Sequence, residues 1–328
     1  MSRRSLSALG ALLAVGVLVG CAPTTSGSAH PDWAAVDAAM AERFDHELDR
    51  MFDSLDAIDP FTSDAEPAVT GVSYTHMQFD VREVRVQSEV IMVGNPVSVV
   101  ARRSSAYTGL MIDRVHVAGD PVDYLLLGDA YTDLAPTAWV QAPSTVNHDE
   151  DSPFRDFMNL CFIEGFDGVC NINNAIYYTE QSDAADRMRK SVTVDNDGGV
   201  HARTEVTFAA AIQAQAVLAD DDVVAMWSEE MLDSFIPVSF WLDPDGRFVK
   251  IELNGTVRGT GEISDVTLQV GFEVTGEATQ ADIPDRPAPE DVTVLTRDDL
   301  ADFYARMEEI LMERIRAEQG ELEAGEAA

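Results

Sequence analysis

The stretch SFWLDPDGRFVKIEL (Ser239–Leu253) gives the clearest indication of the fold. Two β-rich runs flank the residues Asp243–Gly246, where proline presets φ and glycine readily adopts a positive φ, as a tight turn requires. The second run alternates apolar Val249, Ile251 and Leu253 with polar neighbours. This period of two is typical of a strand with one buried and one solvent-facing side. The stretch therefore predicts an antiparallel β-hairpin.

Strand-like patterns extend from this hairpin toward both ends of the chain. Leu268–Val274 alternates in the same way, and Val192–Val194 with Val200–Ala209 predicts a second hairpin. Earlier runs rich in β-branched and aromatic residues are separated by turn residues. These runs are Val72–Val81, Val84–Met92, Val97–Val100, Leu110–Val117, Tyr124–Leu127, Tyr131–Leu134 and Thr137–Gln141. The pattern predicts a long antiparallel sheet, which the proline-rich stretch Ile283–Pro289 is expected to end.

Apolar residues that recur every three or four positions predict helices. Trp33–Ile58 carries such a stripe and ends before Pro60, Asp298–Arg316 carries another, and a short helix is expected after the N-cap Asp222. Phe154–Met188 is ambiguous, with helix as one interpretation. A sheet that is apolar on one face must bury that face. We therefore expect an α+β fold: a curved antiparallel sheet, or half-open β-barrel, with helices on its concave face.

The N-terminus has the parts of a bacterial export signal. Arg3 and Arg4 precede the apolar run Leu6–Val19, which is shorter than the roughly 20 apolar residues that a membrane-spanning helix needs. The run ends in Leu18-Val19-Gly20-Cys21, which resembles the bacterial lipobox. That resemblance implies that the Cys21 thiol is lipidated. It also implies that the lipoprotein signal peptidase recognises Leu18, Val19 and Gly20 and removes residues 1–20.

The residues after the lipobox agree with an anchored protein. Residues 21–31 are mostly small and polar, so they suit a flexible tether. Two or three acyl chains on Cys21 anchor a protein durably, whereas a single chain binds a membrane only marginally. The expected location is therefore extracytoplasmic, with the protein held by its lipid at the outer face of the cell membrane.

The composition has a large excess of acidic residues. The chain contains 22 Lys and Arg against 58 Asp and Glu, a formal net charge of −36. Removal of Arg3 and Arg4 with the signal leaves 20 basic and 58 acidic residues, or −38. Repulsion excludes nucleic acid as a partner and disfavours docking on anionic lipid head groups. The acidity fits either a salty habitat and general solubility or the capture of a cationic partner.

Two further cysteines, Cys161 and Cys170, flank the short stretch FIEGFDGV. Outside the cytoplasm, such a pair favours a disulfide over a metal site or a redox motif. None of the six histidines lies within metal-ligand spacing of another, and no catalytic motif is present. The sequence therefore predicts a structural disulfide, no metal, no cofactor and no enzymatic activity.

Four segments resemble the LppX/LprA/LprF/LprG family of actinobacterial lipoproteins, which share the fold of the lipoprotein carrier LolA. They are Tyr124–Pro143, Val200–Gln215, Ser239–Leu253 and Leu268–Thr296. In that family a hairpin with a similar turn precedes a strand, and a short IP-P stretch closes the sheet. The resemblance implies a LolA-like domain over residues 32–296.

The chain is longer than that family. The comparison with the family makes residues 143–189, with the predicted disulfide, an insertion, and residues 297–318 an additional C-terminal helix. The acidic and alanine-rich residues 319–328 have the composition of a disordered tail.

A LolA-like fold implies an apolar cavity between the sheet and the helices, a common place for ligands. The chain is then expected to bind a lipid or lipoglycan in the cell envelope and to take part in its transport. The residues expected to line the cavity are Tyr74, Phe79, Phe240, Leu242, Val249, Ile251, Leu268, Val270 and Phe272. The same residues suit a filled core equally well. The alternative is therefore an anchored interaction or scaffold module, whose protein partner the sequence does not name.

Overall fold

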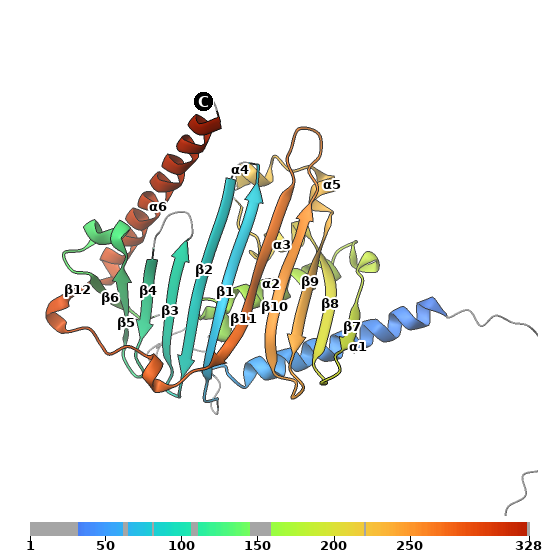
Figure 1. The fold of residues 1–328 in the computed structure, drawn as a ribbon, viewed down its shortest axis with the longest axis horizontal. Coiled ribbons are helices and arrows are strands. Elements are labelled where there is room, and N and C mark those ends of the chain that lie inside the picture. Colours follow the sequence, from blue (N-terminus) through green and yellow to red (C-terminus); the bar gives the residue numbers. More distant parts are fainter. Residues whose placement is uncertain are drawn as a thin grey trace, which may run out of the picture.

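The chain folds around one large, curved and unclosed β-sheet (Figure 1). The computed structural model describes residues 32–61, 65–80, 82–105, 111–144, 159–219 and 221–326. Its 12 strands lie in the order β12-β6-β5-β4-β3-β2-β1-β11-β10-β9-β8-β7, so β12 and β7 are the two edges. Neighbouring strands run antiparallel, except that β12 is parallel to β6. The expected α+β class with an open antiparallel sheet is confirmed.

Two groups of neighbouring strands meet at the centre of the sheet. On one side lie β2 (Arg82–Val93), β3 (Ser98–Ser105), β4 (Met111–His116), β5 (Val122–Leu127), β6 (Trp139–Pro143) and β12 (Val292–Val294). On the other lie β7 (Ser191–Val194), β8 (Val200–Thr207), β9 (Phe235–Leu242) and β10 (Phe248–Val257). The central strands β1 (Ala68–Phe79) and β11 (Val266–Glu277) pair with each other and join the groups. The predicted meander is therefore split in two, with its late and early parts side by side.

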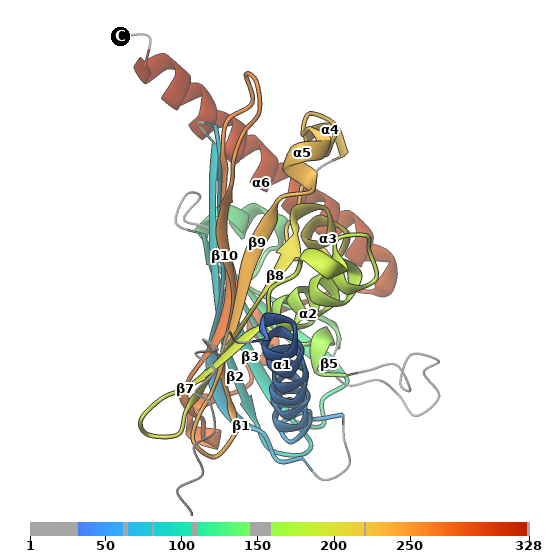
Figure 2. The same cartoon turned by 90° about the vertical axis from the view of Figure 1, so that its right-hand side faces the viewer.

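The helices α1, α2, α3 and α5 are layered on one face of the sheet, which we call the inner face (Figure 2). The helix bounds are α1 (Trp33–Asp56), α2 (Asp167–Glu180), α3 (Phe208–Gln213), α4 (Asp221–Val224), α5 (Glu229–Leu232) and α6 (Arg297–Glu326). The opposite side is called the open face. Within the described part of the chain, no helix is both long enough and apolar enough to cross a membrane.

The long helix α1 shows how the apolar pattern fills the inner face. Asp32 caps the helix by accepting a hydrogen bond from a first-turn backbone N–H at 3.3 Å. The stripe then buries Phe44, Met51 and Leu55. Phe44 packs edge-on against Phe240 of β9, with ring centroids 5.5 Å apart. The predicted amphipathic helix therefore packs directly against the predicted strand.

The middle of the chain supplies a second piece of this inner layer. Cys161 and Cys170 form the predicted disulfide, with Cα atoms 5.8 Å apart, and it links a short 3₁₀ turn to α2. Ile172 and Ile176 of α2 are almost completely buried in the main core. The described part of residues 143–189 is thus an integral part of the core, while residues 145–158 lie outside the described residues.

One predicted strand is a helix. Residues 131–134 belong to the 3₁₀ helix η1 (Asp129–Leu134) and pair with no neighbouring strand. Tyr131 and Leu134 are both buried in a second core together with Phe303 of α6. A 3₁₀ turn brings positions i and i+3 to the same side, whereas a strand separates them. The spacing of these two residues therefore favoured the helix.

The sequence predicted that the sheet ends at the proline-rich stretch, but the sheet continues beyond it. The chain after β11 crosses the open face, where Ala278 and Ile283 are buried against Val100 and Val115. It then adds β12 in parallel to β6. A parallel partner of three residues has no turn signal of its own, because the connection crosses the sheet instead of forming a hairpin.

Several helix boundaries also differ from the prediction. β8 ends at Thr207, whose hydroxyl caps α3, so the predicted strand to Ala209 is too long. The single short helix expected after Asp222 is two helices, α4 and α5. The C-terminal helix α6 continues to Glu326 and takes in most of the tail that was expected to be disordered.

Candidate functional site

The inner-face residues predicted to line an apolar cavity are packed against other side chains. Six of them are at most 6% exposed: Phe240, Leu242, Ile251, Leu268, Val270 and Phe272. Phe272 lies with its ring centroid 4.3 Å from that of Phe166 and 6.2 Å from that of Phe248. Side chains from the helices thus occupy the place where acyl chains were expected.

The other three predicted cavity residues do not share one space. Phe79 is half-buried on the inner face, with its ring centroid 5.9 Å from that of Trp227. Tyr74, an odd number of positions away on the same strand, points to the open face. Val249 falls at an irregularity between Phe248 and Lys250, where a β-bulge puts Phe248 into the core instead. Tyr74 and Val249 were therefore placed on the wrong side by the sequence interpretation.

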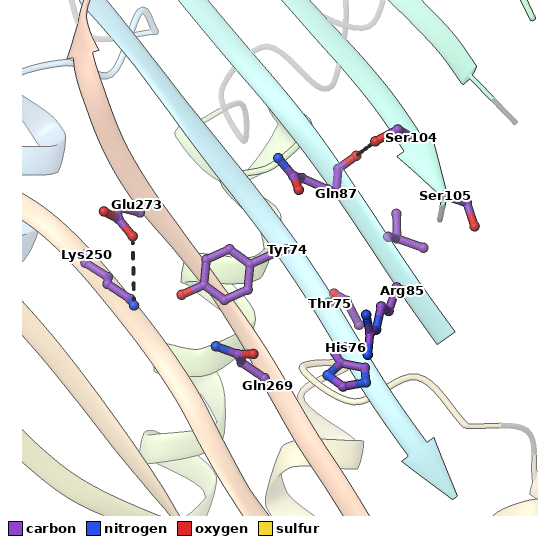
Figure 3. Close-up of a pocket in the computed structure, with 11 residues that line it drawn as sticks. Tyr74, Thr75, His76, Arg85, Gln87, Ser104, Ser105, Lys250, Gln269 and Glu273 are labelled. Carbon is purple, nitrogen blue, oxygen red and sulfur yellow. Dashed lines mark hydrogen bonds and ion pairs between the residues drawn. The ribbon is translucent and has the colours of Figure 1, made fainter. Parts of the chain in front are cut away.

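A polar hollow of about 570 Å³ lies on the open face, over the centre of the sheet (Figure 3). Tyr74 of β1, Lys250 of β10 and Gln269 and Glu273 of β11 lie close together around it. Lys250 lies 3.8 Å from Glu273, and its ammonium group sits 5.6 Å from the centre of the Tyr74 ring.

Glu252 is the centre of a hydrogen-bond network at this hollow. Its carboxylate accepts from Tyr74 Oη at 2.6 Å, from Gln269 Nε2 at 3.1 Å and from Asn254 Nδ2 at 3.2 Å. Lys250 Nζ lies 3.0 Å from the same group. Burial raises the pKa of Glu252, but these four partners outweigh burial and lower that pKa to about 2. Glu252 is therefore ionised over the whole physiological range.

Gly271 makes this network possible. In the sheet register Tyr74, Gly271 and Glu252 are direct neighbours on three adjacent strands. A Cβ atom at Gly271 would lie 2.7 Å from Tyr74 Oη, so only glycine leaves room for the tyrosine to reach across β11. The sequence correctly placed Gln269, Gly271 and Glu273 on the solvent-facing side of this strand. The glycine inside a strand was the available signal for the crossing tyrosine.

This chemistry suits hydrogen bonding and not proton transfer. Burial and the Glu252 carboxylate raise the pKa of Tyr74 above its ordinary value, so the phenol keeps its proton. Glu252 holds no proton and its oxygens are already engaged. Neither group is poised as a general acid or base near neutral pH. At this solvent-facing patch Tyr74, Lys250 and Gln269 all bind the Glu252 carboxylate.

A second polar cluster lies near the lower end of β4 on the inner face. His116 Nδ1 is 2.9 Å from Asp123 Oδ1 and 3.1 Å from Ser144 Oγ, and all three residues are buried. The three residue types match a catalytic triad, but a triad needs serine and aspartate on opposite ring nitrogens. Here both contact Nδ1. The geometry is that of a buried histidine whose Nδ1 is engaged by its neighbours.

Comparison with known proteins gives no family. No protein-family model and no curated protein matches the chain. Among solved structures, it is similar to the crystal structure of a DUF1329 family protein from Desulfovibrio piger, with 10% sequence identity over 76% of this chain and 95% of that one. The TM-score is 0.19, so this likeness carries no argument about function. The lipobox residues Leu18, Val19, Gly20 and Cys21 lie outside the described residues.

Proposed function

We propose that the chain is an extracytoplasmic lipoprotein, anchored through Cys21, whose body is a binding module with a filled core. The apolar run and Leu18-Val19-Gly20-Cys21 support the anchor. The Cys161–Cys170 disulfide supports an oxidising compartment. The body then reaches its partners through its surface, held close to the membrane by the tether.

The packing of the inner face is the observation that supports a module over a carrier with a standing cavity. Phe240 and Phe272 have no exposed surface, and Phe44 and Phe166 lie directly on them. None of these four rings lines the hollow on the open face. An acyl chain would have to displace aromatic side chains that are already packed, which costs the dispersion contacts they make.

Transport of a lipid or lipoglycan, in the manner of the LppX-type lipoproteins with a LolA-like fold, is the second candidate. One observation favours it: helices cover a single face of an unclosed sheet, and α3, α4 and α5 are only 6, 4 and 4 residues long. Short separate helices can move apart more easily than one long helix. Each Å² of acyl surface that enters would gain about 25 cal/mol.

Native mass spectrometry separates the two candidates. The protein is expressed in its own host with a cleavable export signal of a non-lipidated protein in place of residues 1–21, so that the exported form starts at Ala22 and is purified from the envelope without detergent. The filled-core module predicts a bare protein mass that stays unchanged after incubation with host lipid extract. One lipid per chain that disappears on denaturation would instead establish the carrier.

The anchor is tested separately on the full chain. Metabolic labelling with a fatty acid should label the wild-type protein and leave the Cys21→Ser variant unlabelled. The variant should also keep its signal peptide, since the lipoprotein peptidase acts after lipidation. A Cys21→Ser protein that is still cleaved at the same bond would contradict the lipobox assignment.

A further inference from the structure

Exposed apolar side chains occur both on the first turns of α1 and on the edge strand β7, which α1 contacts, and we call this region the corner. Trp33 is 66% exposed, Val194 is 51% exposed and Val36 is 39% exposed. The first turns of α1 extend beyond β7, past the edge of the sheet (Figure 1). Trp33 and Val36 belong to the same stripe that further along the helix buries Phe44 and Met51. In the described residues this part of the stripe has no strand beneath it.

Among the described residues, no strand pairs with the outer side of the edge strand β7. Antiparallel pairs alternate between residues that exchange hydrogen bonds and residues that do not. The Asp195 N–H donates to the Gly199 carbonyl at 2.8 Å, so Thr193, two positions earlier, also bonds to β8. Val192 and Val194 therefore direct their N–H and C=O groups outward. Their side chains lie on the inner face, the side that α1 covers.

The strand β7 is short, with four residues, but proline and charge, two usual protections of an edge strand, are missing from it. Its sequence is Ser-Val-Thr-Val. The lysine that precedes it does not guard the edge: Lys190 Nζ is 2.7 Å from Asp45 Oδ1 and 2.6 Å from Glu180 Oε1. Lys190 Nζ also lies 5.3 Å from the Phe44 ring centre. These contacts hold α1 against the start of β7.

The length of α1 that extends beyond β7, here called the overhang, can be compared with the spacing between strands. Trp33 precedes Phe44 by eleven positions, or about 16 Å along a helix. Phe44 packs on Phe240 of β9, so this span also passes over β8 and β7. With strands about 4.8 Å apart, it leaves room for about one more strand beyond β7. The projecting turns of α1, which we call the roof, would cover one face of a strand that paired with the free edge of β7.

We propose that this corner docks an extended segment of a partner protein, which pairs with β7 as an additional strand. Alternate apolar side chains of the segment pack beneath Trp33 and Val36, while its main chain bonds to Val192 and Val194. The segment carries basic residues at its other positions, because the chain has a net charge of −36 and the exposed Asp195 directly follows β7. A second copy of the chain carries the same negative charge, which disfavours self-pairing here.

The test uses the full chain in detergent micelles and two labelled ten-residue peptides, one alternating valine with lysine and one alternating valine with glutamate. We expect the lysine peptide to bind at least tenfold more tightly than the glutamate peptide. Val194→Pro removes one outward N–H, and Trp33→Ser removes the roof; each should weaken binding at least tenfold. Leu218→Ser, which removes an equally exposed apolar side chain elsewhere, should change binding less than twofold.

Amide hydrogen exchange provides the structural readout. The peptide should slow exchange at Val192 and Val194 and leave the paired Thr193 unchanged. Trp33→Ser lies in an exposed helical turn, so the test stands even if Val194→Pro impairs folding.

Absence of lysine-peptide binding, or binding that neither variant weakens, overturns the proposal. So does a dimer in sedimentation that Val194→Pro abolishes, or binding to phosphatidylcholine vesicles that only Trp33→Ser abolishes, since these assign the corner to a second copy or to the membrane.

This inference deepens the proposed function by naming the surface of the module and the chemistry of its partner. The two can fail separately. A lipid found in the core by mass spectrometry would remove the filled-core module and leave the strand-docking edge intact. Peptides that do not bind to a chain with a lipid-free core would remove the edge site and leave the module.

Discussion

The two faces of the central sheet are built from the same strands and held by different forces. On the inner face of β11, Leu268 and Phe272 are buried among aromatic side chains from the helices. On the open face of the same strand, Gln269 and Glu273 take part in hydrogen bonds and ion pairs with groups on neighbouring strands. Packing dominates one side and polar pairing the other. Substitutions one position apart should therefore differ several-fold in their effect on stability.

The largest effect is expected for Phe272→Ala. Its ring lies 4.3 Å from that of Phe166 and fills the space beside Gly71, where even one added carbon would overlap it. Truncating such a residue leaves a cavity and costs about 3–5 kcal/mol of unfolding free energy. Guanidinium denaturation of both proteins measures this difference. A loss below about 1 kcal/mol would show that the inner face is loosely packed, and would revive the carrier with a standing cavity.

Removal of the disulfide should have the next largest effect. The Cys161→Ser, Cys170→Ser double variant frees a loop of about ten residues, which in the chain-entropy account costs about 3 kcal/mol. The bond fastens the start of α2, whose Ile172 and Ile176 lie in the core. The loss should therefore appear in global unfolding, measured by denaturation with and without a reducing agent. If reduction exposed only α2 to proteolysis and left the unfolding midpoint unchanged, this helix would be a separable flap over the inner face.

The contrast between the faces was partly predictable from the sequence. Alternation in Leu268–Val274 assigned every side chain of that stretch to its correct face, and the helical stripe of α1 identified its buried side. These signals are local: they follow from the periods of a strand and a helix. The disulfide was also predictable, because only Cys161 and Cys170 remain once Cys21, the proposed site of lipidation, is set aside.

The errors came from features that a period cannot show. A bulge at the start of β10 shifts the alternation by one residue, so Phe248 and not Val249 enters the core. Tyr74 and Phe79 both looked suitable for a cavity, yet their odd separation puts them on opposite faces of one strand. The crossing of Ile283 to the open face and the parallel pairing of β12 depend on contacts distant in sequence. These long-range contacts can be identified only in the folded structure.

The variant Glu252→Gln tests whether polar pairing on the open face stabilises the fold. The pKa of Glu252 is about 2 in the folded protein, against an ordinary value of 4.5. Ionisation of Glu252 therefore stabilises the fold fully above the unfolded pKa. This contribution is lost as pH falls from about 4.5 to about 2. The shift corresponds to at most about 3 kcal/mol, and screening by solvent reduces it to about 2 kcal/mol. The difference in unfolding free energy between wild type and variant should therefore be largest at pH 7 and shrink toward pH 2. A difference independent of pH would mean that the amide disturbs packing and that charge has no part in the effect.

The smallest predicted effect isolates one hydrogen bond of that network. Gln269→Ala removes the 3.1 Å donor to Glu252, a loss of about 1 kcal/mol. Since that donor helps to lower the pKa of Glu252, the variant should also raise this pKa, which NMR titration of the carboxyl carbon measures. Gln87→Ala is the matched control, because Gln87 lines the same hollow from β2 without a hydrogen bond to Glu252. If both variants shifted the pKa equally, the general polarity of the open face would set it. A shift in Gln269→Ala alone would show that the face works through specific pairs, as the inner face works through specific contacts between rings.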